Sequence, residues 1–448
     1  MEILILLQPH KLKINALWDH VEAFDLYSRH RVAFACGALP SQAWLEGGVD
    51  YAGYDVLLIP HHCRVCMGER SFHPEVDRAI RDFDGYKVLI IQDEYDRTEI
   101  ARQWILDHGI DHVFTAVPPG QIERVYDPRR FAGVEFTNVL TGYVPSNLER
   151  GRSWRPLAQR PCHIVYRCRE RGSWRGELCH QKLEIAKVVK SRAEERGIPT
   201  DIEWAEDRLV FGPAWHEFLQ RGRATLGSPS GSNVFDLDGS ITAAVDAALT
   251  ENPDLGYENL EGHFFQDGNL GVRMNQISPK FFEFIASGTA LILIEDDYSG
   301  ILEPEKHYLP LRKDYSNLDK IFDALEDLPR IEEMTQRTYH DIIASGRYSY
   351  RAAIAEFDDL LAARVRPRRG GSKPPAAPAG RARDIQPTLM PPRSHTSYLQ
   401  AQLSSDIHAF ETRFLRPLQE MSEDYAGMIQ RRRAKIEKLS RKSAHEQR

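Results

Sequence analysis

Lys280 and Glu283 stand in a stretch whose pattern predicts a short helix. Backbone N–H groups at a helix N-terminus carry partial positive charge, so with Lys280 beside them they can hold an anion. Glu283 lies one turn further in. A carboxylate there suits hydroxyl groups rather than a phosphate, and a vicinal diol such as a ribose satisfies both of its oxygens. The residues alone leave a second interpretation open, an ordinary Lys and Glu on a solvated helix face.

Residues 278 to 294 supply the elements that would position these two side chains. Ser278 is suited to cap the helix, Pro279 to occupy its first position and Gly288 to end it. The apolar run Ala290 to Ile294 follows directly and predicts a buried parallel strand.

A cluster of arginines follows a second predicted strand, His163 to Arg167, and precedes a predicted helix over residues 177–196. Its members are Arg167, Arg169, Arg171 and Arg175. Guanidinium groups pair with phosphate oxygens in a forked geometry, so this cluster could bind a diphosphate. A solvated group of charges is the alternative.

Small residues follow the next predicted strand, Ala224 to Gly227. Ser230 and Gly231 are among them, and Asp236 comes shortly after. Small side chains let a backbone approach a ligand closely, although a turn that only needs positive φ would look the same.

The first third of the chain alternates predicted strands and helices, which is the rhythm of a parallel, doubly wound sheet. Ligands of such sheets lie outside the carboxyl ends of the strands. The polar residues expected at those ends are Gln8 and His10, then His61 and His62, then Asp93, Glu94 and Tyr95. We take His10, His61, Asp93 and Glu94 as candidates for acid–base or hydroxyl-binding work, with Asp93 preferred. Caps and satisfied loop residues are the alternative for each.

Cys63 and Cys66, next to His61 and His62, have the spacing of metal ligands. No second pair of this kind exists in the sequence, so we expect free thiols and no metal site.

Composition predicts about two domains with extra segments, because 448 residues exceed the usual length of a single domain. The net charge of −7 hides a split, since residues 366–448 carry 17 Lys and Arg against 8 Asp and Glu. An acidic body is a poor general binder of nucleic acid, so we expect no such partner. No apolar run in the sequence is long enough to span a membrane, and the residues before Ile3 to Leu7 lack the basic region of a signal peptide. We therefore expect a cytoplasmic protein. The six cysteines are irregularly spaced, which fits a reducing compartment better than a disulfide framework.

Beyond the body, residues 364–394 are rich in Pro, Gly, Ala and Arg and predict a disordered linker. Residues 395–442 carry apolar side chains at alternating threes and fours, which predicts a helical, coiled-coil-like tail. Self-association, docking on a partner helix and peripheral contact with the inner face of a membrane all stay open for this basic tail. A solvated helix end is the simpler alternative.

Four segments resemble the carboxyl-terminal half of bacterial group 1 glycosyltransferases of the GT-B fold, in the branch linked to polysaccharide synthesis and spore-coat maturation. They are residues 167–182, 226–240, 278–288 and 307–311. The resemblance covers roughly residues 160–363, and the amino-terminal half agrees in layout and in Gln92 to Tyr95.

The resemblance implies an α/β protein with two Rossmann-like domains that face a cleft. Residues 1–150 would form the acceptor domain, 160–345 the nucleotide-sugar donor domain, and 346–363 a helix that crosses back to the first domain. Glu283 would hold the donor ribose, while Lys280 with Arg167 or Arg169 would neutralise the diphosphate. We add Ser230 and Gly231 as donor-binding residues, and Asp93 and His61 as catalytic residues.

The implied activity is metal-independent transfer of a sugar from a nucleotide sugar, without a further cofactor, to a glycan, lipid-linked or protein acceptor. One position departs from the family. Many retaining members carry a second glutamate eight positions before the one matched by Glu283, and this chain has Asn275 there. Retention or inversion therefore stays open. So do two other hypotheses, a non-catalytic assembly scaffold and a nucleotide-sugar epimerase.

Overall fold

The first sheet organises the amino-terminal half of the protein. The computed structural model describes residues 1–8, 15–36, 51–149, 153–169, 173–210 and 213–367. Six parallel strands pair in the order β2-β1-β3-β4-β5-β6. The strands are β1 (Glu2–Leu7), β2 (Arg31–Cys36), β3 (Val56–Ile59), β4 (Tyr86–Ile91), β5 (His112–Thr115) and β6 (Glu135–Asn138).

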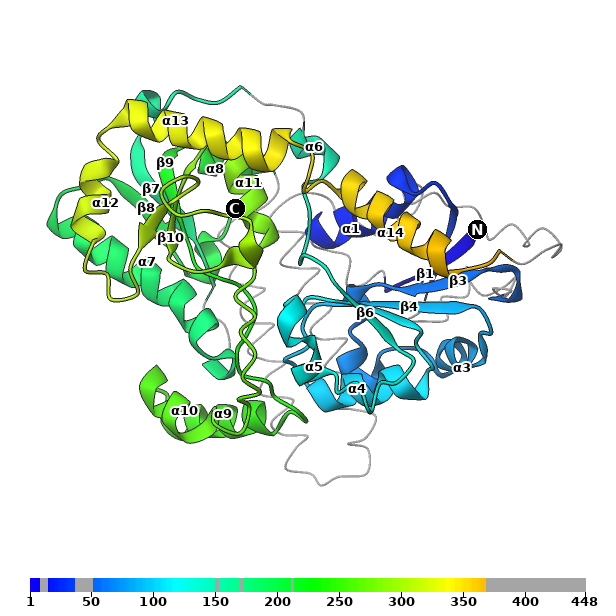
Figure 1. Cartoon of the computed structure of the whole chain (residues 1–448). Helices are drawn as coiled ribbons and strands as arrows, with labels where there is room; N and C mark the ends of the chain where they lie inside the picture. The colour runs from blue at the N-terminus through cyan, green and yellow to red at the C-terminus, as the bar shows by residue number, and fades with distance from the viewer. Residues whose placement is uncertain (9–14, 37–50, 150–152, 170–172, 211–212, 368–448) are drawn as a thin grey trace, which may run out of the picture. The chain divides into compact units, whose positions relative to one another are not determined.

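Helices cover both faces of this sheet (Figure 1). They are α1 (Asn15–Tyr27), α3 (Pro74–Asp82), α4 (Thr98–Asp107), α5 (Ile122–Val125) and α14 (Tyr350–Arg364), the last helix described. α14 packs against α1 and the sheet, since Phe357 contacts Phe24 and Phe114 with ring centroids 5.2 Å apart in each pair. Asp358 accepts hydrogen bonds from Ser28 at 2.9 Å and from the backbone N–H of Arg29 at 2.7 Å.

The second sheet has five parallel strands in the order β11-β10-β9-β7-β8. They are β7 (Cys162–Arg167), β8 (Thr200–Glu203), β9 (Gly222–Gly227), β10 (Ala290–Ile294) and β11 (Leu309–Leu311). Its helices are α7 (Glu177–Glu195), α8 (Pro213–Leu219), α11 (Pro279–Ala286), α12 (Leu318–Ala324) and α13 (Leu328–Tyr339). Every residue of β10 is buried, because helices cover the sheet on both sides. The predicted fold class, two doubly wound α/β sheets, is confirmed.

A segment between β9 and α11 carries α9 (Ser240–Glu251) and α10 (Tyr257–Phe264) and packs on the first half. The first two backbone N–H groups of α4, on Thr98 and Glu99, donate to the carbonyls of Asp236 and Leu237 at 3.1 and 2.8 Å. Asp236 is fully buried and accepts from backbone N–H groups at the start of α9. Although this segment follows β9 in the chain, it therefore shares a hydrophobic core with the first sheet.

The chain passes between the two halves at two neighbouring places. A parallel bridge joins Val144, just before α6 (Ser146–Glu149), to Ser349, just before α14. Val144 donates its N–H to the carbonyl of Tyr348 at 2.8 Å, and Tyr350 donates to the carbonyl of Val144 at 3.0 Å. These two strands of chain hold each other in register where the halves meet.

The expected linker and coiled-coil-like tail lie outside the described residues, apart from residues 364–367. Within the described part of the chain, none of the helices has the length and apolar character needed to span a membrane.

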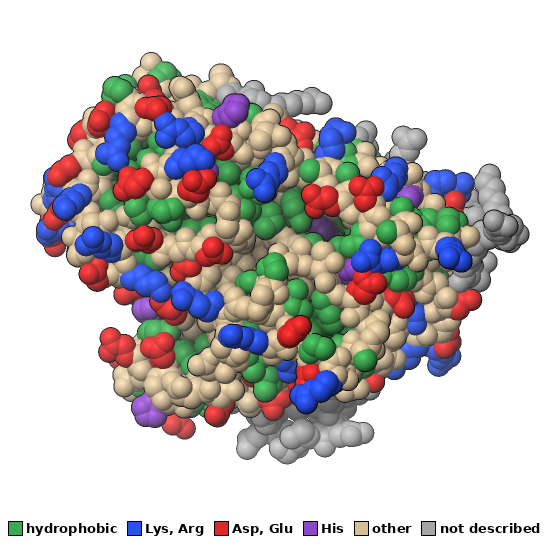
Figure 2. Space-filling model, in the orientation of Figure 1, with side chains coloured by type: hydrophobic (Ala, Val, Ile, Leu, Met, Phe, Trp, Pro, Cys, Tyr) green, Lys and Arg blue, Asp and Glu red, His purple; other side chains and the backbone are tan. Residues whose placement is uncertain are grey.

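On the face drawn in Figure 2, basic and acidic side chains are interspersed rather than gathered into one large patch.

Candidate active site

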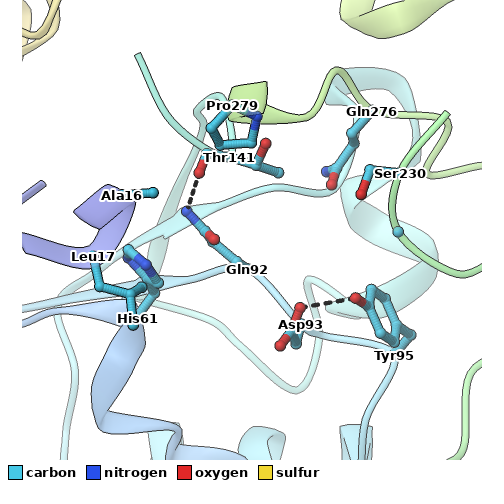
Figure 3. A pocket seen from close by; sticks show the side chains of 11 residues that line it. Ala16, Leu17, His61, Gln92, Asp93, Tyr95, Thr141, Ser230, Gln276 and Pro279 are labelled. Atoms are coloured by element: carbon cyan, nitrogen blue, oxygen red, sulfur yellow. Dashed lines mark hydrogen bonds between the residues drawn. The ribbon is translucent and has the colours of Figure 1, made fainter. Parts of the chain in front are cut away.

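A cavity of about 170 Å³ brings together polar residues from both halves; we call it the Asp93 cavity (Figure 3). The first half contributes Ala16, Leu17, His61, Gln92, Asp93, Tyr95 and Thr141, and the second half contributes Ser230, Gly231, Gln276 and Pro279. Gln92 and Asp93 directly follow β4, the strand end where ligands of parallel sheets are expected.

The wall of the Asp93 cavity is held by two linked hydrogen bonds, the second of which crosses from the first half to the second. Gln92 donates from its side-chain amide to the carbonyl of Thr141 at 2.7 Å. The Thr141 hydroxyl donates to the carbonyl of Ile277 at 2.7 Å, two residues before α11. The end of β4 and the start of α11 are thereby tied through one threonine.

Asp93 is oriented by two donors. Its Oδ1 accepts from the Tyr95 hydroxyl at 2.8 Å, and its Oδ2 accepts from Arg64 at 3.0 Å. The side chain is 39% exposed, so both oxygens are held while the carboxylate still reaches the cavity. Each oxygen retains lone-pair capacity for a substrate hydroxyl. This arrangement suits Asp93 to orient and activate an attacking hydroxyl.

His61 lines the cavity beside Asp93, in a 3-10 turn that follows β3. Burial, together with the neighbouring His62 and Arg64, lowers the pKa of His61 to about 3. The imidazole is therefore neutral near pH 7 and is a weak base there. Its chemistry fits hydrogen bonding to an uncharged group better than proton abstraction.

Ser230 and Gly231 form the opposite wall. Ser230 exchanges two backbone hydrogen bonds with Gln276, at 2.8 and 3.0 Å, and Lys182 lies 3.3 Å from the Ser230 hydroxyl. Gly231 has φ +101°, and a Cβ there would lie 2.8 Å from the Cβ of Met274. The glycine is needed for the tight pairing, and it leaves the backbone open toward the cavity.

α11 begins at Pro279, which lines the cavity, and Ser278 occupies its N-cap position without a side-chain cap bond. Lys280 is exposed, with its ammonium 5.8 Å from the ring of Trp215 in α8. Glu283 accepts a hydrogen bond from the Trp215 indole at 2.6 Å. Burial raises the pKa of Glu283, while the Trp215 bond and Lys280 oppose that change. Lys280 and Glu283 thus lie next to the cavity rather than in its wall.

Asp19 of α1 brings a second carboxyl group near Glu283. Burial and the charges of Glu283 and Glu22 raise the pKa of Asp19 to about 7. Simultaneous ionisation of Asp19 and Glu283 is unfavourable because the two negative charges would repel each other.

Arg167 is placed differently from the prediction that it neutralises a diphosphate. Its guanidinium donates to Asp201 at 2.6 Å and to the carbonyls of Tyr166, Asp201 and Arg208. It is 8% exposed and stacks over Phe218 at 4.3 Å. These contacts anchor β7 to β8, so we leave Arg167 out of the proposed site.

Arg169 is partly exposed, with its Nε 3.7 Å from Glu206, and stays a candidate for the diphosphate. Arg171 and His10 lie outside the described residues. Arg175 stacks over Trp174 at 5.1 Å and lies 6.0 Å from the ring of Tyr95, close to Asp93.

Asn275, the departure from the resembled family, has a structural place. It adopts φ 36° and is 4% exposed. Its side chain donates to Asp296 at 2.5 Å and accepts from Asn233 at 3.1 Å. Asn tolerates a left-handed conformation better than Glu does, which accounts for the residue type at this position.

Of the predicted site residues, Asp93, His61, Ser230 and Gly231 line one cavity. Sequence reasoning did not select Gln276, Thr141, Arg64 or Lys182. Gln276 directly follows Asn275, so its position in the sequence could have indicated a place near the site. Thr141 and Arg64 act through partners distant in sequence, which no spacing reveals.

Cys63 and Cys66 are buried, and neither forms a disulfide bond with a described residue. Cys63 donates to the carbonyl of Leu6 at 3.7 Å, and Cys66 lies 3.8 Å from Arg64. Across the residues that the structure describes, no group of three or more His, Cys, Asp or Glu side chains is arranged to hold a metal ion.

Glu94 points away from the cavity into the core. Its Oε1 accepts from the backbone N–H of Ala116 at 2.9 Å and from the Thr115 hydroxyl. Its Oε2 is buried, with no hydrogen bond from any described residue. Burial raises the pKa of the Glu94 carboxyl from 4.5 to about 7. Glu94 is therefore a structural carboxyl group rather than a site residue.

This burial predicts a pH-dependent stability. Glu94 binds a proton more tightly in the folded state, so its contribution is complete below its unfolded pKa of 4.5 and is lost as pH rises through about 7. Glu94→Gln should match the wild type near pH 4 and exceed its unfolding free energy near pH 8 by about 3 kcal/mol. Urea unfolding at both pH values measures the difference. An equal offset at both pH values would contradict a protonated Glu94.

Comparisons with known proteins concern the fold. No family model matches this chain, and no curated protein matches its sequence. Among solved structures, an alpha-glucosyltransferase bound to UDP and a 13-mer DNA matches with a TM-score of 0.47 and 10% identity, over 81% of this chain and 100% of that one. HepE of Anabaena with UDP-glucose matches at 0.43 and 11%, with shares of 81% and 100%. TarM matches at 0.40 and 11%, with shares of 71% and 57%. At these values the likeness by itself supports no conclusion about activity.

Proposed function

We propose that this protein transfers a glycosyl group from a nucleotide-diphosphate sugar to a hydroxyl group of an acceptor. One observation carries the proposal. Asp93, at the end of β4 in the first half, faces Ser230, Gly231 and the N-terminus of α11 in the second half across one cavity. The two halves thereby present different chemistry to the same space.

The second half supplies groups for a diphosphate and a ribose. The α11 N-terminus offers backbone N–H groups, and Lys280 and Lys182 add positive charge nearby. Arg169 follows the carboxyl end of β7, at the edge of the sheet where ligands are expected. Glu283 would accept ribose hydroxyls through Oε1, because Trp215 already occupies its Oε2. The backbone at Gly231 has room for a sugar–phosphate to approach.

The first half supplies the acceptor side. Asp93 would accept a hydrogen bond from the acceptor hydroxyl and hold its oxygen toward the anomeric carbon of the donor sugar. It would take the hydroxyl proton as the new bond between that oxygen and the anomeric carbon forms. As the bond to the diphosphate breaks through an oxocarbenium-like transition state, negative charge grows on the leaving phosphate. The helix N-terminus and nearby cations would stabilise that charge, so the proposed reaction needs no metal ion.

The acceptor would be a glycan, a lipid-linked sugar or a protein, consistent with the resemblance to enzymes of polysaccharide synthesis. Self-association or docking of a partner helix through the tail, peripheral membrane contact and a cytoplasmic location stay predictions from the sequence. The scaffold hypothesis does not explain why polar groups from both halves line one cavity. The epimerase hypothesis does not explain an Asp93 that is placed to orient an acceptor hydroxyl. Neither hypothesis is therefore favoured.

Donor binding tests the proposal. A nucleoside diphosphate that binds only the folded protein should stabilise it by about 2.7 kcal/mol at a hundred times its Kd. We expect one nucleotide among UDP, GDP, ADP and dTDP to raise the melting temperature clearly. Glu283→Ala should remove most of that increase. Glu333→Ala, on the exposed face of α13 beside Arg337, is the matched control and should keep the full shift. A full shift in Glu283→Ala would contradict the assigned ribose site.

A further inference from the structure

A second cavity, of about 360 Å³, opens next to the first one, at the carboxyl ends of β3 and β4. We call it the Arg64 cavity. It shares Leu17, His61, Gln92 and Asp93 with the Asp93 cavity. Its volume is near the lower end of small-ligand sites, roughly 300–1,000 Å³. A group bound here would therefore reach Asp93 from the first half of the protein.

The charges in the wall of the Arg64 cavity are already balanced. Arg64 and Asp93 are the charged members of its described lining, and they pair with each other at 3.0 Å. Arg64 also binds Asp96, which pairs with Arg97 at 2.8 Å. Two cations and two anions form one closed cluster, so an incoming charged group would have to break an existing pair.

The remaining wall is neutral and mixed in polarity. Pro60, Val65 and Ile91 give apolar surface, while Gln92 and His61 give hydrogen-bonding groups. His61 is uncharged near neutral pH because of its burial. This part of the wall therefore offers a ligand apolar surface and uncharged hydrogen-bonding groups.

We infer that the Arg64 cavity binds an uncharged sugar ring of the acceptor, and that it discriminates against acidic and amino sugars. A pyranose has apolar faces for Val65 and Leu17 and a rim of hydroxyls for Asp93, Gln92 and His61. A carboxylate or ammonium group would lose hydration without finding an unpaired counter-charge among these residues. This inference rests on the proposed function and names its acceptor class.

Ligand-observed NMR tests it directly. The probes are methyl glucoside, methyl galactoside and methyl N-acetylglucosaminide as neutral sugars, with methyl glucuronide and methyl glucosaminide as charged counterparts. The full chain is first saturated with the nucleoside diphosphate that stabilises it. We expect saturation transfer to at least one neutral probe, and affinity lower by about tenfold or more for its charged counterparts. Equal or tighter binding of a charged probe, or no transfer to any neutral one, would overturn the inference.

Two variants sharpen the test. Asp93→Asn gives the cluster a net positive charge, so its affinity for methyl glucuronide should rise severalfold above that of the wild type. Val65→Phe fills the Arg64 cavity and should abolish sugar binding while the nucleotide thermal shift is retained, which also shows that the variant is folded. Unchanged selectivity in Asp93→Asn, or unchanged sugar binding in folded Val65→Phe, would contradict the assigned site.

The outcomes separate this inference from the proposed function. Nucleotide binding together with a preference for charged sugars would refute the acceptor class alone. Absence of binding by every nucleotide would refute the donor site, and with it the glycosyltransferase proposal.

Discussion

Asp93→Asn should lower the rate of glycosyl transfer about a hundredfold or more while donor binding stays unchanged. The amide keeps the size of the side chain and can still accept from Tyr95, but it cannot take a proton from the acceptor hydroxyl. The loss should therefore fall on kcat rather than on the KM for the donor. Steady-state kinetics with the nucleotide sugar that binds measures both constants.

Asp107→Asn is the control for this substitution. Asp107 ends α4 in the same half, is exposed and pairs with Gln103 at 2.7 Å, far from the chemistry proposed here. Its kcat should equal that of the wild type. If Asp93→Asn retained a rate within twofold of the wild type, Asp93 would not be the group that activates the acceptor.

Arg160→Leu should give the largest loss of stability, about 3 kcal/mol or more. Arg160 is 3% exposed and donates to the carbonyls of Arg155 at 3.0 Å, Gly222 at 2.8 Å and Ser287 at 3.2 Å. It also donates to the Thr289 hydroxyl at 3.0 Å. Leucine would leave these acceptors without the Arg160 donors. It would also remove a positive charge from the C-terminal end of α11, where the helix dipole favours a cation.

Burial lowers the pKa of Arg160 to about 10, so the guanidinium stays charged near pH 7. Arg330→Leu is the matched control. Arg330 pairs only at the surface with Glu305, at 3.1 Å, and its loss should cost less than about 1 kcal/mol. Urea unfolding of both variants gives the comparison. Equal small losses would show that the Arg160 contacts contribute little to the fold.

Gly288 gives a further expectation for the same region. It has φ +60°, and a Cβ there would lie 2.3 Å from the Trp154 ring, whose N–H donates to the carbonyl of Ala286 at 3.0 Å. Gly288→Ala should therefore lower the melting temperature by several degrees through strain and displacement of Trp154. Gly346→Ala is the comparison variant, because Gly346 has φ +69° but no atom would lie within 4 Å of an added Cβ. Thermal scans of both variants separate the effect of the Trp154 contact from that of backbone strain.

The sequence predicted those features that depend on neighbouring residues. Ser278, Pro279 and Gly288 marked the limits of a helix, and the structure places α11 at Pro279–Ala286 with Ser278 as its N-cap. The apolar run Ala290 to Ile294 predicted a buried strand, and every residue of β10 is buried because helices cover both faces of its sheet. β2, β6 and β8 were not predicted, and all three lie at sheet edges. β6 and β8 are also short and polar, since half-exposed edge positions need no apolar run.

Features that depend on distant partners could not be predicted. Arg167 stood in an arginine cluster typical of a phosphate site, yet Asp201, which is 34 residues away, engages it. Arg64 orients Asp93 across 29 residues, and Gln276 pairs with Ser230 from the other end of the segment that carries α9 and α10. Local spacing places a residue on an element, but it does not show which charge will neutralise it.

The most direct test of the account is cleavage of the donor. The full-length protein is incubated with each nucleotide sugar and the neutral methyl glycosides, and the nucleoside diphosphate and any new glycoside are detected by mass spectrometry. We predict release from one nucleotide sugar that increases with a neutral acceptor, a product heavier by one sugar, and loss of both in Asp93→Asn. An isomerised nucleotide sugar without transfer, or no cleavage of any donor by folded protein, would contradict a glycosyltransferase.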